Sequence, residues 1–329
     1  MRTLDGTTSL VTGASRGIGR AIAKRLAADG SLVAVHYGTN ESAAEETVAQ
    51  ITEAGGAAFA VGVPLGAADA ADRLWAGLEA GLAERGVPGG IDVLVNNAAI
   101  GGATPTLASA RQDDFDELFA INVKAPFFVV QRGVDLLRDG GRIVNVSSVA
   151  SRIAIPDTLA YAMTKGAINT FSVTLAQELG ARGITVNAVM PGTTATEANA
   201  AWFDAQPALH EAVTGLSALR RVGKPEDVAD VVAFLASPAA RWVTGQVIDA
   251  SGGAHLGFSS ARVRRRKRDC LIYGVRRAGG KLARRRRGPP AVSVGRPGND
   301  KAHDGPSRSG GVRERSQREV LPGSRRVPG

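Results

Sequence analysis

Short apolar, β-branched runs alternate with longer Ala- and Leu-rich segments through most of this chain. The expected strands are Ser9–Thr12, Leu32–Tyr37, Ala57–Val63, Val93–Asn96, Arg142–Ser147, Thr185–Val189 and Gln246–Ile248. The expected helices are Gly19–Asp29, Glu41–Ala54, Ala67–Glu84, Asp113–Leu137, Leu159–Leu179 and Pro225–Ala236. Continuously apolar strands are typical of a parallel sheet that helices cover on both faces. The strict alternation therefore predicts a single α/β domain built on a doubly wound parallel sheet.

The charge of the chain is concentrated at one end. The 329 residues carry a formal net charge of +9, but residues 259–329 hold 21 Lys and Arg against 5 Asp and Glu. Residues 1–258 hold 19 against 26, so the body is mildly acidic and its charge favours neither nucleic-acid nor anionic-membrane binding. Because periodicity stops near Phe258, we expect a folded body of residues 1–257 and a disordered Arg/Gly/Pro-rich tail of residues 258–329.

Two explanations fit the composition of this tail. Arg, Gly and Pro dominate when a GC-rich gene is read in the wrong frame, and the body's heavy use of Ala and Gly indicates such a gene. The alternative is a genuine basic arm, whose clusters Arg264–Arg268 and Arg284–Arg287 would bind polyanions such as nucleic acid in a salt-dependent way. Both explanations predict that the body functions without the tail.

Several classes of protein are excluded by what the sequence lacks. Cys270 is the one cysteine, so no intrachain disulfide can form, and the four histidines are scattered without the spacing of a metal site. No stretch approaches ~20 consecutive apolar residues, which predicts no membrane span. The N-terminal residues show no apolar signal segment, so we expect a cytoplasmic protein.

A glycine-rich turn lies between the first expected strand and the first expected helix. Residues 12–19 read T-G-A-S-R-G-I-G. Glycines at this place permit a tight turn, and they let backbone N–H groups and the helix N-terminus approach a pyrophosphate. The spacing is G-x-x-x-G-x-G rather than the commoner G-x-G-x-x-G. Ordinary turn glycines are the alternative, but the position at the first βα turn favours dinucleotide binding.

Tyr161 and Lys165 stand four residues apart on an expected helix, which places both side chains on one face. A free tyrosine has a pKa near ~10 and is a poor base at neutral pH. An ammonium ~4 Å away, at an effective dielectric constant of ~20, contributes on the order of 4 kcal/mol, or about three pKa units. We therefore expect Lys165 to lower the pKa of Tyr161 toward neutrality, for acid–base catalysis. The alternative is an ordinary surface pair.

Two further polar residues are candidates for the same site. Ser148 follows the strand expected to end at Ser147, at the carboxyl edge where open α/β sheets bind ligands, and its hydroxyl could donate to a substrate oxygen. The alternative is a serine that caps a helix or forms a turn. Asn122 is polar within an otherwise apolar helical stretch. Its alternative is a buried amide bonded to a kinked backbone, which is compatible with a functional role.

The motifs T-G-x-x-x-G-I-G, N-N-A, N-V-S-S, Y-x-x-x-K and a following P-G occur in one order and at one family's spacing. Over residues 1–257 the chain resembles the short-chain dehydrogenase/reductase family, in particular its 3-oxoacyl-reductase-like members. The resemblance implies a Rossmann-type dinucleotide-binding sheet and a homotetrameric enzyme. It implies that Tyr161 is the catalytic acid/base, that Lys165 lowers its pKa and holds the nicotinamide ribose, that Ser148 orients the substrate oxygen, and that Asn122 holds a water relaying protons.

The resemblance also implies which residues contact the cofactor. These are Gly13, Ser15, Arg16, Gly17, Ile18, Gly19, Thr39, Asn40, Asn97, Tyr161, Lys165 and Thr194. Two departures from the family pattern stand out. N-N-A-G reads N-N-A-A, with Ala99 in the last place, and the acid that usually contacts the adenine is missing from Val63-Pro64-Leu65. We therefore expect that adenine hydrogen bond to be lost and the cofactor affinity to be lower.

The sequence favours NADP over NAD as the cofactor. An NAD-preferring chain carries an acid at the end of the second strand, to accept from the ribose hydroxyls. Here that strand is followed by Gly38-Thr39-Asn40, with no acid before Glu41, and the Arg16 guanidinium could face a 2′-phosphate. The alternative is an exposed Arg16 that touches nothing.

The expected function is therefore an NADPH-dependent ketone reductase that transfers hydride between nicotinamide and a carbonyl or alcohol. A 3-oxoacyl-thioester reductase of fatty-acid or polyketide synthesis is the alternative enzyme. A non-catalytic relative with a polyanion-binding tail is the alternative of another class. The segment Thr193–Val222 resembles the family's variable substrate lid, and its apolar residues, Trp202, Phe203, Leu209 and Leu216, favour a partly apolar substrate unless they only pack the lid.

Overall fold

The computed structural model describes residues 3–101, 106–155, 157–197, 199, 207–254 and 256, without the side chains of residues 207–209. One parallel sheet of seven strands, in the order β3-β2-β1-β4-β5-β6-β7, forms its centre. The strands are β1 (Thr8–Val11), β2 (Leu32–Tyr37), β3 (Ala57–Gly62), β4 (Ile91–Asn96), β5 (Leu137–Val146), β6 (Thr185–Pro191) and β7 (Val247–Ala250). This order is that of a Rossmann-type doubly wound sheet, so the expected fold class is confirmed.

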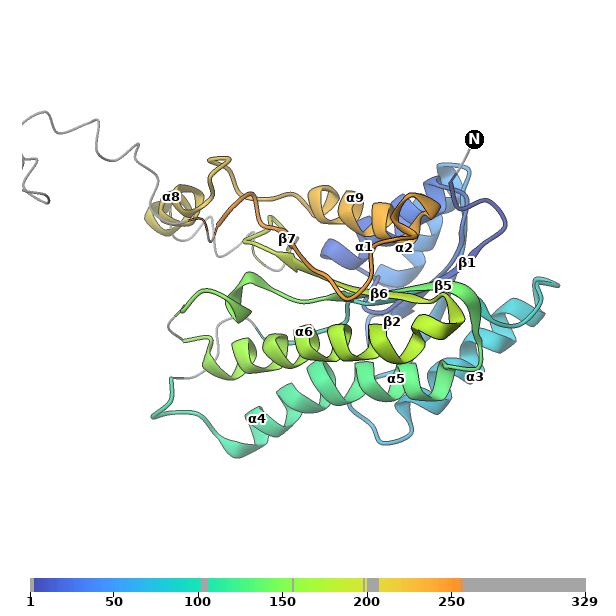
Figure 1. Cartoon of the computed structure of the whole chain (residues 1–329), viewed down its shortest axis with the longest axis horizontal. Coiled ribbons are helices and arrows are strands. Elements are labelled where there is room, and N and C mark those ends of the chain that lie inside the picture. Colours follow the sequence, from blue (N-terminus) through green and yellow to red (C-terminus); the bar gives the residue numbers. More distant parts are fainter. Residues whose placement is uncertain are drawn as a thin grey trace, which may run out of the picture. The chain divides into compact units, whose positions relative to one another are not determined.

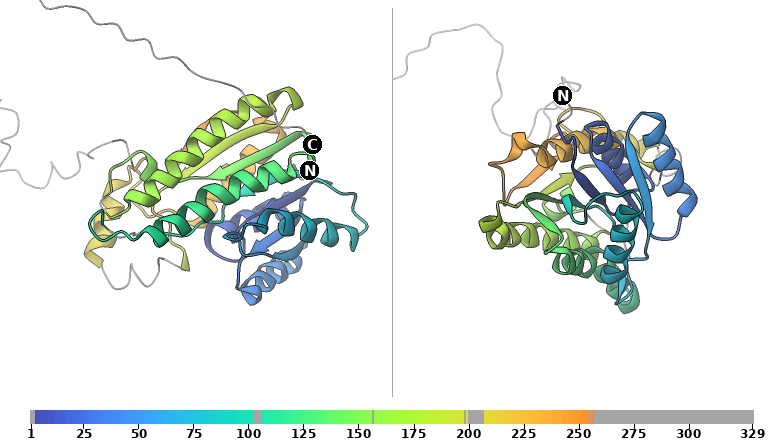
Figure 2. Two further views of the ribbon diagram at one scale, coloured as in Figure 1. Left: turned by 90° about the horizontal axis from the view of Figure 1, so that it is seen from below. Right: turned by 90° about the vertical axis from the view of Figure 1, so that its right-hand side faces the viewer.

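The helices form a layer on each face of the sheet (Figure 1). One layer contains α1 (Gly17–Ala28), α2 (Glu41–Glu53) and α9 (Pro225–Ala236), and the other contains α3 (Ala70–Ala83), α5 (Ala125–Gly133) and α6 (Leu159–Leu179). Each layer buries its own apolar cluster against the sheet, with Ile22, Leu26 and Val232 on the first face. Leu74, Leu78 and Leu175 belong to the second. The views in Figure 2 show the sheet between these two layers.

The strand order reverses beside β1, which pairs with β2 on one side and with β4 on the other. Val11 is in register with both Val35 and Val95, so the three strands end at nearly the same level. Helices on opposite faces leave these strand ends, and a crevice opens there in sheets of this kind. The glycine-rich turn follows β1 and Asn97 follows β4, so the topology places both at that crevice.

The expectation of one continuous helix over Asp113–Leu137 is wrong. The segment consists of α4 (Gln112–Phe119), a π-helical turn (Ala120–Lys124) and α5. The Ala125 N–H bonds the Ala120 carbonyl, five residues back. Pro126 contributes to the break because it lacks the N–H that would bond the carbonyl four residues earlier in an α-helix.

Two other expectations differ from the structure at their boundaries. Leu137 already belongs to β5, where it pairs with Ile91, and a shift in register separates that pair from the regular pairing that begins at Arg142. The proposed lid segment contains α8 (Pro207–Leu216), which we did not expect. Trp202 and Phe203 lie outside the described residues, as do residues 257–329 with the expected disordered tail.

Candidate active site at the ends of β4, β5 and α6

Tyr161, Lys165 and Ser148 lie together, as the sequence predicted. Tyr161 and Lys165 are both in α6, and the Lys165 ammonium lies 5.6 Å from the centre of the Tyr161 ring. The Ser148 side chain hydrogen bonds with the Tyr161 side chain, which joins the end of β5 to the start of α6. Ser148 also caps the short 3-10 turn Val149–Ser151, and its hydroxyl accepts from the Ala150 N–H at 3.2 Å. The Ser148 hydroxyl thus caps a turn, as the alternative held, and that contact is compatible with its candidate role toward a substrate oxygen.

Lys165 is almost fully buried, with 3% of its surface exposed. Its ammonium donates to the Val146 carbonyl at 3.0 Å, while its own backbone carbonyl accepts from the Ser147 hydroxyl at 3.1 Å. Burial lowers the pKa of Lys165 to about 8, because the charged form loses its hydration. The ammonium is therefore mostly protonated at neutral pH and held against the end of β5.

The pKa of Tyr161 moves opposite to the expectation drawn from charge alone. Burial raises it above the ordinary value of a phenol, and the Ser148 hydrogen bond lowers it by less. The argument from spacing counted the attraction of the ammonium and left out the loss of hydration. The ammonium instead bonds the Val146 carbonyl. Because its pKa is raised, Tyr161 keeps its proton at neutral pH in the protein alone.

Asn122 lies in the π-helical turn and is 1% exposed. Its amide oxygen accepts from the Ile100 N–H, and its amide nitrogen donates to the Ile100 carbonyl, both at 2.9 Å. The same nitrogen lies 3.3 Å from the hydroxyl of Thr164, the residue before Lys165. Asn122 is therefore a buried amide at a helix irregularity, as the alternative held. Its contacts also connect the loop after β4 to α6.

Two positions of the glycine-rich turn, Gly13 and Gly19, have no room for larger residues. A Cβ on Gly19 would lie 2.1 Å from the Gly13 carbonyl oxygen and 2.5 Å from the Asn97 amide nitrogen. Gly13 has a φ of +63°, and a Cβ there would lie 2.8 Å from the Ala98 Cα. The Asn97 amide donates to the Thr12 and Gly13 carbonyls at 2.9 and 3.0 Å. Asn97 therefore holds the turn from the end of β4.

The N-terminus of α1 is shaped to receive an anion. Arg16, its N-cap residue, makes no side-chain cap, and the first turn contains no acid. Helix geometry leaves N–H groups of this turn without helical partners and concentrates positive charge there, which suits a pyrophosphate. Arg16 is exposed, and its side chain has no hydrogen bond or ion pair within the described part of the chain. Apart from the Gly17 N–H, which bonds Glu197, the residues of this turn thus fit a phosphorylated dinucleotide.

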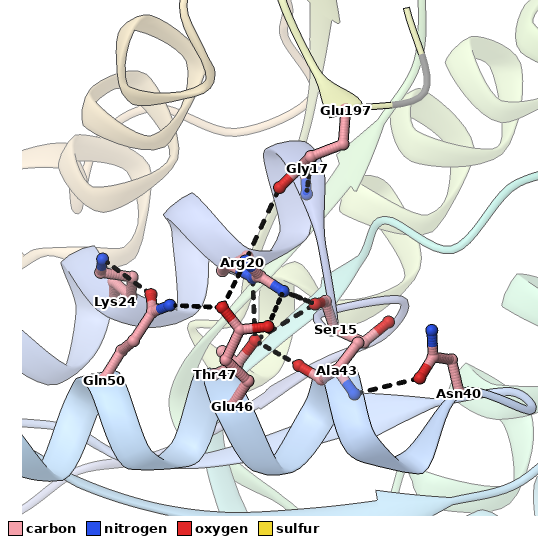
Figure 3. A network of polar contacts seen from close by, with 10 residues as sticks. All are labelled: Ser15, Gly17, Arg20, Lys24, Asn40, Ala43, Glu46, Thr47, Gln50 and Glu197. Carbon is pink, nitrogen blue, oxygen red and sulfur yellow. Dashed lines mark hydrogen bonds and ion pairs between the residues drawn. The ribbon is translucent and has the colours of Figure 1, made fainter. Parts of the chain in front are cut away.

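Arg20 and Glu197 belong to this turn, and the sequence analysis missed both. Arg20 donates to the Ser15 carbonyl at 2.7 and 3.1 Å and contacts Thr47 and Glu46 of α2 (Figure 3). Glu197, from the segment after β6, accepts from the Gly17 N–H at 3.1 Å and lies 3.6 Å from Arg20. No local pattern reveals contacts between residues 180 positions apart, although an Arg following the glycine motif was a usable signal.

The remaining expected cofactor residues are placed as follows. Thr39 is exposed beyond β2, and Asn40 is the N-cap of α2, where its side chain accepts from the Ala43 N–H at 3.0 Å. Thr194 is buried and its hydroxyl donates to the Gly192 carbonyl at 3.0 Å. Thr194 also bridges to Gly223, which fixes the backbone after β6. Asn40 therefore has a structural role whether or not it touches a cofactor.

The described residues contain no group of three or more His, Cys, Asp or Glu that could hold a metal ion. Among them, no helix combines the length and apolar character that crossing a membrane demands.

The chain is similar to families and proteins of known class. Residues 13–255 match the model of the family described as enoyl-(acyl carrier protein) reductase. Versicolorin reductase of Emericella nidulans is 38% identical over 262 residues, which cover 76% of this chain and 96% of that protein.

Two solved ketoreductases are similar in structure as well. LugOII, a promiscuous reductase that catalyses keto-reduction at C1 during lugdunomycin biosynthesis, is 50% identical with a TM-score of 0.74, over 77% of this chain and 99% of that chain. The angucycline C-6 ketoreductase LanV, solved with bound NADP, is 49% identical with a TM-score of 0.74, over 78% of this chain and 98% of that chain.

Proposed function

Because this chain belongs to the short-chain dehydrogenase/reductase family of oxidoreductases, we propose that it is an NADPH-dependent ketone reductase. The observation that carries the proposal is the protonated Tyr161, bonded to Ser148 and backed by the buried Lys165. Reducing a ketone to an alcohol requires a hydride for carbon and a proton for oxygen. A phenol whose pKa is raised by burial holds its proton at neutral pH, and releasing that proton requires the nearby Lys165 cation to stabilise the phenolate as it forms.

The roles of the site residues follow from their contacts. The hydroxyls of Ser148 and Tyr161 would both hydrogen bond the substrate oxygen, which favours negative charge on that atom. Tyr161 would then give up its proton, and the Lys165 cation beside the ring would stabilise the phenolate. Asn122 would support the Lys165 end of α6 through Thr164, and holding a water there is its proposed further role. NADPH, when bound, supplies the hydride.

The cofactor would lie across the glycine-rich turn. Backbone groups of Gly13, Ser15, Gly17, Ile18 and Gly19 would surround its pyrophosphate. The others would contact its two nucleotides: Arg16, Thr39, Asn40, Asn97, Tyr161, Lys165 and Thr194. Arg16 supports NADPH over NADH, because it is an exposed cation with no partner in the described residues, and because no acid lies between the end of β2 and Glu41. LanV has been solved with NADP bound, which agrees with this choice.

We propose a polycyclic aromatic ketone as the substrate class. The similar proteins are named as a versicolorin reductase, a reductase that acts at C1 during lugdunomycin biosynthesis and an angucycline C-6 ketoreductase, LanV, which has also been solved with rabelomycin. Several apolar side chains of this chain are exposed, two of them in the stretch of sequence that connects the proposed catalytic residues. Ile155 and Leu159, between Ser148 and Tyr161, are 40% and 52% exposed, and Leu216 of α8 is 55% exposed. Flat apolar rings would cover such side chains.

The homotetramer also remains a proposal. The helices α5, α6 and α9 expose large apolar side chains, among them Phe127, Val173 and Phe234 at 46–48% exposure. Burying such side chains between copies of the chain would favour assembly. Sedimentation or light scattering of residues 1–257 would show the assembly state, and a monomer would contradict the proposal. The cytoplasmic location likewise stays a prediction.

The test is NADPH oxidation over a panel of carbonyl substrates. We expect turnover with polycyclic ketones such as rabelomycin and little with 3-oxoacyl thioesters, and the reverse result would favour the thioester-reductase alternative. Tyr161→Phe should lower kcat by roughly 10²–10⁴-fold without unfolding the protein. Tyr37→Phe is the matched control, since it removes a hydroxyl that bonds Glu41 and should keep kcat at saturating NADPH. Near-normal turnover in Tyr161→Phe would contradict the proposed mechanism.

A further inference from the structure

His36 is a buried titratable residue to which the proposed mechanism gives no role. It lies near the carboxyl end of β2, in register with Val61 of β3, and is 1% exposed. Both ring nitrogens have partners. Nδ1 lies 3.0 Å from the backbone nitrogen of Gly13, and Nε2 lies 2.8 Å from the backbone oxygen of Val63. The ring thus spans from the glycine-rich turn to the residue that follows β3.

The partners of His36 fix its protonation state. A backbone N–H can only donate, so Nδ1 must accept from Gly13. A carbonyl can only accept, so Nε2 must carry the proton that bonds Val63. Only the neutral imidazole protonated at Nε2 satisfies both bonds. Burial lowers the pKa of His36 to about 4, which agrees with a ring that stays neutral.

The backbone reinforces the same connection. The Ala14 N–H donates to the His36 carbonyl at 2.8 Å, and the Val63 N–H donates to the Tyr37 carbonyl at 2.9 Å. The Gly13 carbonyl accepts from Asn97, so this residue is held from β2 through its N–H and from β4 through its oxygen. The position of Gly13 in turn sets where α1 begins, because Gly19 packs directly against its carbonyl.

We infer that His36 is a positioning residue for cofactor binding: its neutral imidazole fixes the first glycine of the phosphate-binding turn and ties it to the loop after β3. The inference rests on the proposed function only in taking a nicotinamide dinucleotide as the ligand of that turn. His36 touches no reacting atom, so it sets the affinity for the dinucleotide and leaves the chemical step alone. The imidazole anchors the Val63 loop, where the family's adenine-contacting acid is missing.

Three substitutions separate the two hydrogen bonds. In His36→Asn the amide oxygen can take the place of Nδ1 and accept from Gly13, whereas in His36→Gln the amide nitrogen can take the place of Nε2 and donate to Val63. His36→Leu provides neither. Direct fluorescence titration gives the Kd for NADPH, and steady-state assay at saturating NADPH and ketone gives kcat.

We expect the Kd for NADPH to rise ~10-fold or more in His36→Gln and His36→Leu, because the buried Gly13 N–H loses its acceptor. His36→Asn should stay within about threefold of the unchanged chain, and kcat should stay within about threefold in all three variants. Ser31→Ala is the control for stability. It removes a buried hydroxyl that lies 2.6 Å from the Ser9 hydroxyl, just before β2, and should lower the Tm without changing the Kd.

Equal Kd values in the unchanged chain, His36→Gln and His36→Leu would overturn the inference. So would equal losses in His36→Asn and His36→Gln, which is the pattern of a merely structural role. If His36→Leu fails to fold, the comparison of the Asn and Gln variants decides alone. If the chain binds NADH in place of NADPH, the Kd values for NADH must rank the variants in the same order. Binding of neither dinucleotide would overturn the proposed function together with this inference, whereas unchanged Kd values in variants of a binding protein overturn the inference only.

Discussion

Replacing Gly19 by Ala should damage both the fold and the cofactor site, because the added carbon has no space. It would lie 2.1 Å from the Gly13 oxygen, and ordinary contact begins at 3.4 Å, so the carbonyl must move by about 1.3 Å. That carbonyl is bonded to Asn97, whose amide would also lie 2.5 Å from the new carbon. Overpacking of this kind costs ~1–3 kcal/mol, and each weakened hydrogen bond adds ~1 kcal/mol.

We therefore expect Gly19→Ala to lower the free energy of unfolding by about 3 kcal/mol, which corresponds to roughly 6–12 °C in Tm for a body of this size. The Kd for NADPH should rise at least ~10-fold, since the displaced groups are those that surround the pyrophosphate. Thermal unfolding and fluorescence titration measure the two effects. Gly180→Ala is the matched control, because Gly180 has a helical φ of −59° with nothing within 4 Å of a new Cβ. That variant should gain up to ~1 kcal/mol.

The reasoning would be refuted if Gly19→Ala kept its Tm within the change seen in the Gly180 control and bound NADPH within about threefold of the unchanged chain. Such a result would mean that the turn can shift without cost. The lack of space for a Cβ at Gly19 would then limit neither the residue at that position nor the binding of the dinucleotide.

Three further predictions concern other parts of the chain. Arg16→Ala should reduce the preference for NADPH over NADH by roughly 10–100-fold, since a charge-assisted hydrogen bond contributes ~1.5–3 kcal/mol, and an unchanged ratio of kcat/KM values would contradict the assignment. The pKa of His36 is lowered to about 4 in the folded chain, so the unfolded chain binds the proton first as the pH falls below about 6.5. Its contribution to the free energy of unfolding, about 3 kcal/mol in total, is complete above that pH and is lost as the pH falls to about 4. Urea unfolding across this range should therefore show a fall in the free energy of unfolding of the unchanged chain that is absent from His36→Asn. Truncation after Gly257 should preserve turnover and NADPH affinity, and a truncated protein that fails to fold would show that the tail is structural.

The local features of this protein were readable from its sequence. The alternation of strand and helix patterns predicted the Rossmann-type sheet, and the structure and the similar proteins confirm both fold and family. The spacing of Tyr161 and Lys165 placed them on one helical face, as found in α6. The glycines located the first turn, because glycine at this place in a sequence directly indicates a backbone that leaves no room for a Cβ. The assignment of individual catalytic and cofactor roles stays a prediction.

Tertiary structure alone decided the electrostatics and the partners of the site. The sequence placed a cation near Tyr161, but the pKa of the phenol is raised because hydration is lost, and burial depends on every element packed around it. Nothing local to His36 indicated that Gly13 and Val63 would bond its two nitrogens, or that Glu197 would reach Gly17. Spacing along a helix fixes which side chains share a face. Desolvation and long-range hydrogen bonds depend on which distant segments the fold brings together, and those terms set the charge and position of each group in the site.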